Sequence, residues 1–135
     1  MAVFRPKDLL ITGGAGFIGS ECVRAAVRKG HRPLVVDTLT YAGDLARLKD
    51  VAGKIRFQRM DIGSAALGTL VGRFKPDAVI HFAAETHVDR SILYPEQFVA
   101  ANVQGTLNVL SAAHKAGVGQ HSNVQSLDYM TCDRK

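Results

Sequence analysis

The chain has 135 residues and a net charge of +5, with 47% apolar and 21% charged residues. This composition is typical of a one-domain globular protein and argues against a disordered chain or a fibrous repeat. The two cysteines, Cys22 and Cys132, lie far apart in the sequence. Their spacing excludes a zinc motif or a disulfide scaffold and favours a reducing, cytoplasmic compartment. Because no apolar run reaches 18 residues and the start is unlike a signal peptide, we expect no membrane span.

The positive charge does not follow the pattern of a nucleic-acid-binding surface. Arg24, Arg28, Lys29 and Arg32 lie near the end of an expected helix, where cations interact favourably with the helix dipole. The other basic residues are scattered, and no aromatic residues alternate with a basic stripe. We therefore expect no nucleic acid as partner, although the positive field would favour a small ligand that carries phosphate.

Apolar runs of strand length alternate with helical patterns along the chain, which predicts βαβ units and a parallel sheet. The expected strands are residues 9–12, 34–37, 55–60 and 78–83, and the expected helices are residues 16–29, 40–50, 64–74 and 95–116. The first two strands are apolar throughout and belong in the centre of the sheet, whereas the third alternates and belongs at an edge. The sequence thus predicts an α/β fold of the Rossmann type: a doubly wound parallel sheet in the order 3-2-1-4 between two layers of helices.

The helix expected over residues 95–116 has Pro95 in its first turn and an apolar stripe at helical spacing. Val99, Val103, Leu107 and Leu110 make up this stripe. After Gly117 the pattern fades, because residues 118–125 hold two valines among polar residues. A fifth strand is expected there by the fold, but the sequence does not clearly supply it.

A glycine-rich turn joins the first strand to the first helix. It contains Gly13, Gly14, Gly16 and Gly19, which satisfy both G-x-G-x-x-G and G-x-x-G-x-x-G. Glycines at this point let the backbone approach a pyrophosphate, and the helix N-terminus stabilises its charge. A plain glycine-rich turn is the alternative. The context favours a dinucleotide, because the motif follows a strand and begins a helix, and because an acidic residue, Asp37, ends the second strand.

Asp37 also distinguishes between the two nicotinamide cofactors. A carboxylate there accepts hydrogen bonds from the adenosine ribose and repels a 2′-phosphate. Since the next residue is Thr38 rather than arginine, the sequence predicts NAD rather than NADP. Capping of the following turn by Asp37 is compatible with this role.

Two further strand ends reach the same edge of the sheet. Asp61 can meet the adenine amino group while Ile62 covers the ring, although Asp61 would equally well cap the helix over 64–74. The fourth strand ends at residues 82–84 (Phe-Ala-Ala), where the small alanines leave room for a nicotinamide ribose. Alternatively, the same alanines would allow a close contact between a helix and this strand.

Four segments together resemble one family. They are residues 12–19 (TGGAGFIG), 37–43 (DTLTYAG), 61–62 (DI) and 81–92 (HFAAETHVDRSI). This series is similar to the extended short-chain dehydrogenase/reductases, and the second and fourth segments resemble those of the dTDP-glucose 4,6-dehydratases among them. The resemblance extends over roughly residues 9–118.

The glycine motif and the resemblance together imply an NAD site and a sugar-nucleotide substrate. The implied NAD-binding residues are Gly13, Gly16, Phe17, Ile18, Gly19, Asp37, Thr38, Leu39, Thr40, Asp61, Ile62, Phe82, Ala83, Ala84 and Glu85. Thr86 is implied to touch the nucleotide-sugar. The family reaction oxidises the sugar at C4, eliminates water across C5–C6 and returns the hydride to C6, so that dTDP-glucose becomes dTDP-4-keto-6-deoxyglucose. A homodimer through the 95–116 helix is also implied.

The catalytic segments of the family have no counterpart in this sequence. Members carry S-T-D-E-V-Y-G at the end of the fifth strand and a later Y-x-x-x-K, in which lysine lowers the tyrosine pKa. Here residues 126–129 read SLDY, and Tyr129 is followed four positions later by Asp133. We therefore predict no catalytic residue, a truncated NAD-binding domain over 1–117, a divergent tail over 118–135 and no activity of the isolated chain.

The sequence is compatible with three alternatives to a dehydratase. The chain could derive from a nucleotide-sugar 4-epimerase, from a decarboxylase, or from a non-catalytic NAD-binding module. No metal is expected, because His87 and Asp89 in one loop do not make a metal site.

Overall fold

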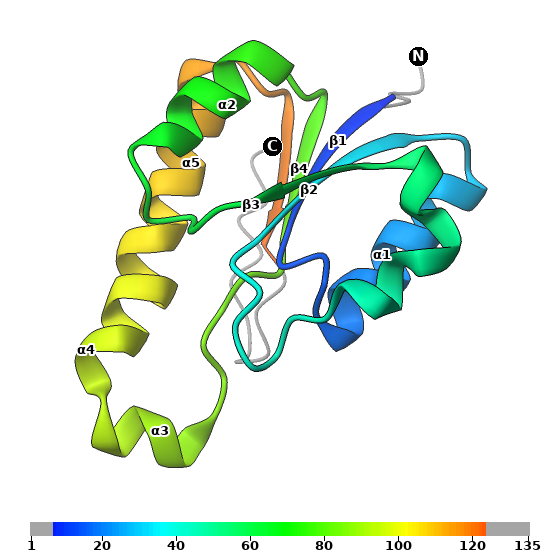
Figure 1. The fold of residues 1–135 in the computed structure, drawn as a ribbon. Coiled ribbons are helices and arrows are strands. Elements are labelled where there is room, and N and C mark those ends of the chain that lie inside the picture. The colour runs from blue at the N-terminus through cyan, green and yellow to red at the C-terminus, as the bar shows by residue number, and fades with distance from the viewer. Residues whose placement is uncertain (1–6, 124–135) are drawn as a thin grey trace.

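Five short strands form one parallel sheet in the order β3-β2-β1-β4-β5. The computed structural model describes residues 7–123 (Figure 1). The strands are β1 (Asp8–Thr12), β2 (Arg32–Asp37), β3 (Arg56–Arg59), β4 (Ala78–His81) and β5 (Gln120–Asn123). This topology confirms the predicted fold class and the 3-2-1-4 order, and it adds a fifth strand beside β4.

Strand β5 consists of polar residues, which is why its sequence carries no strand pattern. Its backbone pairs with β4 from Ala78↔Gln120 to His81↔Asn123, and polar side chains are tolerated at the edge of a sheet. The strand lies inside the segment predicted as a divergent tail. The rest of that segment, from residue 124 onward and including Tyr129 and Asp133, lies outside the described residues.

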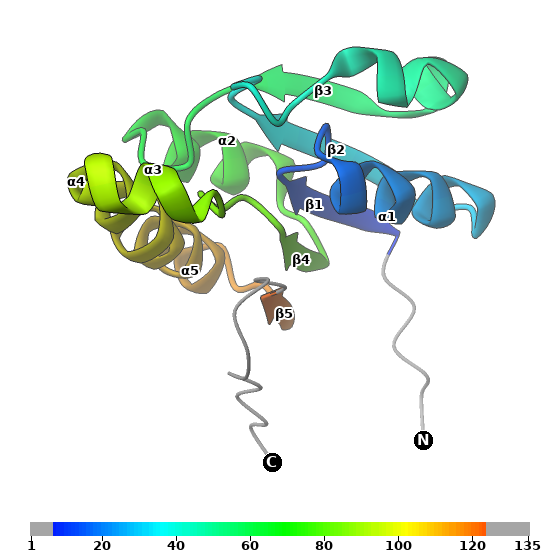
Figure 2. The same ribbon diagram turned by 90° about the horizontal axis from the view of Figure 1, so that it is seen from below.

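Helices cover both faces of the sheet (Figure 2). They are α1 (Phe17–Arg28), the 3₁₀ segment η1 (Leu45–Lys54), α2 (Ala66–Phe74), α3 (Val88–Leu93), α4 (Pro95–Phe98), the π-helical segment η2 (Val99–Gly105) and α5 (Thr106–Lys115). The helices α1 and η1 pack on one face, and α2 and α5 on the other. Gly30 and Gly117, with φ of +82° and +70°, follow α1 and α5 as the left-handed residues that commonly end helices.

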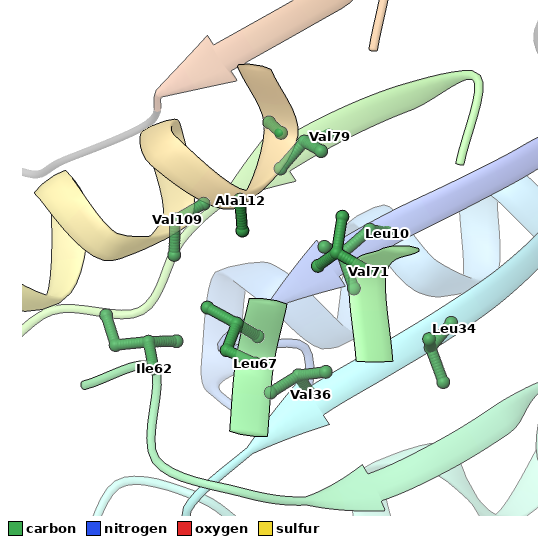
Figure 3. Packing of buried hydrophobic residues seen from close by; sticks show 10 residues of the cluster. Leu10, Leu34, Val36, Ile62, Leu67, Val71, Val79, Val109 and Ala112 are labelled. Atoms are coloured by element: carbon green, nitrogen blue, oxygen red, sulfur yellow. The ribbon is translucent and has the colours of Figure 1, made fainter. Parts of the chain in front are cut away.

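The central strands are buried on both sides, as their continuous apolar sequence predicts. Leu10, Val36 and Val79 pack against α2 and α5 (Figure 3). Leu9, Ile11 and Val35, their neighbours along the strands, pack against α1 and η1. In β3, by contrast, all four residues are exposed or half-exposed, which confirms its predicted position at an edge.

The segment from α4 to α5 differs from the single helix that the sequence predicts over residues 95–116. It is interrupted by η2, and the stripe of Val99, Val103, Leu107 and Leu110 is 43–62% exposed. This segment buries the side that carries Gly105, Val109, Ala112 and Ala113. These residues fit closely because they are small: a Cβ on Gly105 would lie 2.7 Å from Ile62 Cδ1.

Within residues 7–123, none of the helices combines the length and the hydropathy that crossing a membrane requires.

Candidate functional site

A cleft of about 510 Å³ opens at the carboxyl ends of the strands. It lies where the strand order reverses between β1 and β4, the usual ligand position in open α/β sheets. Of the predicted binding residues, those that line it are Gly13, Gly16, Phe17, Ile18, Gly19, Asp37, Thr38, Thr40, Asp61, Ile62, Phe82, Ala83, Ala84, Glu85 and Thr86. Residues from four strand ends thus converge on one cleft, and Leu39 is the exception.

Close backbone packing requires the glycines of the β1–α1 turn. Gly13 has a φ of +68°, and a Cβ there would lie 2.6 Å from the backbone nitrogen of Ala83. A Cβ on Gly19 would lie 2.1 Å from the carbonyl oxygen of Gly13. Side chains at these two positions would therefore push the turn away from both β4 and the first turn of α1.

The N-terminus of α1 faces the cleft without a competing anion. Gly16 is the N-cap residue, no side chain caps the helix, and the first turn contains no acidic residue. The first backbone N–H groups of an α-helix have no acceptor within the helix, and the helix dipole favours an anion beside them. This end of the cleft therefore fits the pyrophosphate of a dinucleotide.

Asp37 is held in place by two backbone N–H groups. Its Oδ2 accepts a hydrogen bond from the Ala15 N–H at 3.0 Å, and its Oδ1 accepts one from the Leu39 N–H at 2.8 Å. Gly43 packs against the same carboxylate, since a Cβ there would lie 2.8 Å from Oδ1. The aspartate is 8% exposed, so its charge is presented to the cleft with little freedom to move.

Leu39, which the sequence predicts as a cofactor-binding residue, is not among the described residues that line the cleft. Its φ of +57° turns the chain sharply after β2, and its side chain packs against the core on the α1 face. Its N–H group orients Asp37. Leu39 therefore contributes to the site through the aspartate.

The segment after β3 forms a third wall of the cleft. Asp61 Oδ1 accepts a hydrogen bond from the Gly63 N–H at 2.7 Å, and Ser64 Oγ accepts one from the Ala66 N–H at 3.2 Å. Ser64, rather than Asp61, thus serves the first turn of α2, which leaves Asp61 at the cleft. The carbonyl oxygen of Ile62 is fixed by a 2.6 Å hydrogen bond from Asn108 Nδ2.

The segment after β4 is held by a side chain that the sequence prediction missed. Asn102, in η2, accepts from the Glu85 N–H and donates to the Glu85 carbonyl oxygen, both at 2.8 Å. This pair of hydrogen bonds fixes the backbone beside Thr86. Segments of π-helix occur frequently at functional sites, but nothing in the sequence marks this one.

Tyr41 connects the loop after β2 to the segment after β4. Its hydroxyl donates to Glu85 Oε2 at 3.3 Å, and the Arg90 guanidinium lies over its ring at 4.8 Å. Partial burial, followed by the negative charge of Glu85, raises the pKa of Tyr41. The tyrosine thus stays protonated and able to donate to Glu85 at neutral pH.

His81 lies beneath the cleft in the centre of the sheet. Its Nδ1 is 2.5 Å from Thr12 Oγ1, and its Nε2 is 3.0 Å from Thr106 Oγ1. Burial, together with the nearby His121 ring, lowers its pKa to about 4. The ring is therefore neutral at pH 7 and links β1, β4 and α5.

Six residues line the cleft in addition to those predicted: Val36, Ala42, Gly43, Arg47, Met60 and Ala101. Ala42 and Gly43 belong to the DTLTYAG segment, and Met60 precedes Asp61, so their neighbours in the sequence could have indicated them. Arg47 and Ala101 reach the cleft through the folding of η1 and η2.

A second cleft, of about 1220 Å³, lies beside β4 and β5 and is lined by residues of both α1 and α5. Its lining includes Leu9, Ile80 and Ala113, with His31 and His121 among the polar residues. None of its described lining residues is acidic or belongs to the glycine turn. Convergent polar groups and an open helix N-terminus thus single out the first cleft as the functional site.

Comparison with known proteins agrees with this site. The family model described as "NAD dependent epimerase/dehydratase family" matches residues 9–129. The dTDP-glucose 4,6-dehydratase of Mycolicibacterium smegmatis is 48% identical over 116 residues, which are 84% of this chain and 34% of the relative. The probable dTDP-glucose 4,6-dehydratase of Sinorhizobium fredii is 51% identical over 110 residues, or 79% of this chain and 31% of the relative. The chain thus spans about a third of the length of these relatives.

Solved structures agree in fold. The dTDP-glucose 4,6-dehydratase DesIV of Streptomyces venezuelae, with NAD and TYD bound, has a TM-score of 0.76 at 44% identity and covers 84% of this chain and 38% of its own. The UDP-Glc/GlcNAc 4-epimerase of Campylobacter jejuni has a TM-score of 0.81 at 30% identity. The match covers 87% of this chain and 36% of the epimerase chain. The strand order, the glycine turn and the family match over residues 9–129 lead to one conclusion: the chain belongs to the NAD-dependent epimerase/dehydratase family.

Proposed function

We propose that the chain is the NAD-binding part of a dTDP-glucose 4,6-dehydratase. The observation that carries the proposal is that Asp37, fixed by two backbone N–H groups, and the open N-terminus of α1 line one cleft. A carboxylate at the end of β2 suits the ribose hydroxyls of NAD, and a helix N-terminus suits its pyrophosphate. The walls formed by Ile62 and by Phe82 to Glu85 would hold the adenine and nicotinamide ends.

The chain's own residues bind and orient the cofactor in this proposal. NAD, when bound, would take up and return a hydride in each turnover of the complete enzyme. Thr86, next to the backbone that Asn102 fixes, would touch the nucleotide-sugar. Because neither S-T-D-E-V-Y-G nor Y-x-x-x-K occurs in the sequence, we propose that these 135 residues alone do not turn over dTDP-glucose.

Calorimetric titration of the purified chain with NAD, NADP and dTDP-glucose tests the proposal. We expect NAD to bind, NADP to bind at least about tenfold more weakly because of the Asp37 charge, and no 4-keto-6-deoxy product to form. A chain that fails to bind NAD would contradict the proposal. Turnover of dTDP-glucose by the chain alone would contradict the proposal that these 135 residues are inactive by themselves.

The second candidate is part of a nucleotide-sugar 4-epimerase, which the TM-score of 0.81 to an epimerase favours. The higher sequence identity to the dehydratases favours the first candidate. A chimera separates the two: the aligned 116 residues of this chain replace their counterparts in the M. smegmatis dehydratase, and a parallel chimera is built on the C. jejuni epimerase. We expect 4-keto-6-deoxy product from the first and little inversion at C4 from the second, and the reverse result would favour the epimerase.

The proposal includes a homodimer formed through the exposed stripe of Val99, Val103, Leu107 and Leu110. Contiguous apolar side chains on a helix surface are typical of protein–protein contacts. We also propose a cytoplasmic location, which the presence of only two cysteines supports. The scattered positions of the basic residues support the proposal that the chain does not bind nucleic acid. We also propose that residues 1–117 belong to the NAD-binding domain and that residues 118–135 form a tail whose sequence diverges from the family.

A further inference from the structure

Arg47 is a cation of the cleft that lies outside every motif of the sequence. Its Nη1 donates to the carbonyl oxygens of Ala15 at 3.1 Å and Ala42 at 2.9 Å. Both hydrogens of that nitrogen are thus used on backbone acceptors. They fix the guanidinium between the glycine turn and the loop after β2, where it lines the cleft.

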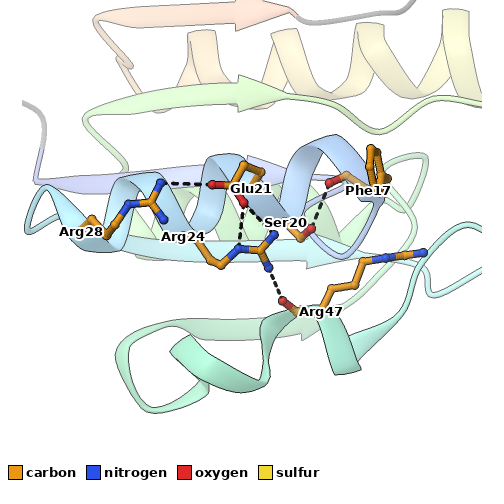
Figure 4. A network of polar contacts seen from close by, with 6 residues as sticks. All are labelled: Phe17, Ser20, Glu21, Arg24, Arg28 and Arg47. Atoms are coloured by element: carbon orange, nitrogen blue, oxygen red, sulfur yellow. Dashed lines mark hydrogen bonds and ion pairs between the residues drawn. The ribbon is translucent and has the colours of Figure 1, made fainter.

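A chain of polar contacts from α1 fixes the backbone of Arg47 (Figure 4). Arg24 Nη1 donates to the carbonyl oxygen of Arg47 at 2.5 Å, and Glu21 Oε2 pairs with Arg24 Nη2 at 2.8 Å. The figure shows the Arg47 side chain running toward the end of α1 at which Phe17 lies. Because Ala15 immediately precedes the N-cap residue Gly16, the guanidinium lies at the same end of α1 as the open N–H groups.

The charge of Arg47 has no acidic partner among the described residues. Within residues 7–123, the ion pairs to carboxylates involve Arg24, Arg28 and Arg32. The Nε and Nη2 atoms of Arg47 have no hydrogen-bond acceptor in this part of the chain, so three N–H donors remain for a ligand. A half-buried guanidinium with fixed orientation and free donors is a typical phosphate-binding group.

We propose that Arg47 binds the pyrophosphate of the dinucleotide and adds a fixed positive charge to that of the α1 N-terminus. The inference rests on the proposed NAD binding. A 2′-phosphate on the adenosine ribose is the competing source of the same chemistry. The anchoring of Arg47 on Ala15 favours the pyrophosphate, and the carboxylate of Asp37 disfavours a second phosphate beside it.

The test compares a ligand with the pyrophosphate to one without it. The wild-type chain, Arg47→Met and Arg47→Lys are each titrated with NAD, adenosine and NADP, and their folding is checked by thermal melting. We expect Arg47→Met to weaken NAD binding about tenfold or more, the usual effect of losing a charge-assisted contact, while the affinity for adenosine changes less than about twofold. Arg47→Lys retains the charge and recovers most of the affinity for NAD.

The matched control is Lys49→Ala, which removes an exposed cation from the same η1 segment. It should leave the affinity for NAD unchanged. The dissociation constant for NAD should also rise less steeply with salt in Arg47→Met than in the wild type, because one charge contact is lost.

Four results would overturn the inference. Equal weakening of NAD and adenosine in Arg47→Met would mean that the side chain merely positions the loop after β2. If Arg47→Met binds NAD as tightly as the wild type, Arg47 does not bind the pyrophosphate. If the variant loses affinity for NADP alone, Arg47 binds a 2′-phosphate instead. A wild-type chain that binds neither NAD nor adenosine would contradict the proposed function and, with it, this inference.

Discussion

The carboxylate of Asp37 and the backbone N–H of Ala15 lie 3.0 Å apart and join the end of β2 to the glycine turn after β1. The same carboxylate also accepts the Leu39 N–H. Asp37 therefore shapes the cleft through these two hydrogen bonds, in addition to presenting a negative charge to it. Its structural and binding roles can be separated by substitution.

We expect Asp37→Asn to weaken NAD binding about tenfold or more and to reduce the discrimination against NADP, because the charge facing the ribose is lost. Asparagine keeps one side-chain oxygen, so one of the two backbone N–H groups loses its acceptor, at a cost of about 1–3 kcal/mol in unfolding free energy. Calorimetry with both cofactors and urea unfolding measure the two effects. Asp50→Asn, on the exposed side of η1, is the control, and equal behaviour of the two variants would refute the role of Asp37.

Gly13→Ala should disrupt the glycine turn. The substitution forces an alanine to a φ of +68° and brings its Cβ to 2.6 Å from the Ala83 nitrogen, so we expect at least about 1–3 kcal/mol of destabilisation and loss of NAD binding. Gly53→Ala is the matched control, because a Cβ there meets nothing within 4 Å. Urea unfolding of both variants tests the expectation. A Gly13→Ala chain as stable as Gly53→Ala would show that the turn relaxes.

His81 should make the stability of the chain depend on pH. Burial first, and then the neighbouring His121, lower its pKa from 6.5 to about 4. Because the folded state binds the proton more weakly than the unfolded state, the contribution is present above pH 6.5. It is lost as the pH falls from 6.5 through about 4, and amounts to about 3 kcal/mol.

Urea unfolding at pH 7, 5.5 and 4.5 measures this contribution when the wild type is compared with His81→Asn. The variant leaves the carboxylates in place, so the difference between the two pH profiles belongs to His81. The exposed His114 on α5 provides the control substitution, His114→Asn, which should follow the wild type. Parallel profiles for the wild type and His81→Asn would show that the buried ring does not resist protonation.

The exposed stripe on η2 and α5 should mediate self-association. A glutamate in place of Leu107, which is 53% exposed, would place a charge inside the proposed contact, where it must lose its hydration. We expect Leu107→Glu to raise the dissociation constant of the dimer about tenfold or more, measured by analytical ultracentrifugation. Gln104→Glu adds the same charge at an exposed polar position of η2 and should leave the dimer intact. A monomeric wild type would contradict the homodimer.

The sequence predicted those parts of the molecule whose residues carry local physical signals. Continuous apolar runs indicated the central strands, and the spacing of Gly13, Gly16 and Gly19 indicated the turn at α1. Asp37 and Asp61 could be placed at the cleft because the carboxyl ends of parallel strands meet at one edge of the sheet.

The features that were missed depend on contacts between distant residues. β5 forms because Gln120–Asn123 pair with β4, although its polar side chains give no strand pattern. The stripe of Val99 and Leu107 has the period of a core face, yet Gly105 and Ala112 are the residues that let the helix approach the sheet. Arg47 reaches the cleft only after η1 has folded, and Asn102 meets the backbone of Glu85 only after η2 has folded.

The contact between Gly105 and Ile62 places the cleft and the exposed stripe on opposite sides of the helical segment formed by η2 and α5. Ile62 forms part of the cleft wall, and a helix with its side chains is only about 10 Å across. Any displacement of the helix by an associating partner therefore moves this wall, and a ligand that immobilises the wall restrains the helix. An association that displaces the helix and a ligand that restrains the wall would then change each other's equilibrium constant by the same factor, as thermodynamic reciprocity requires.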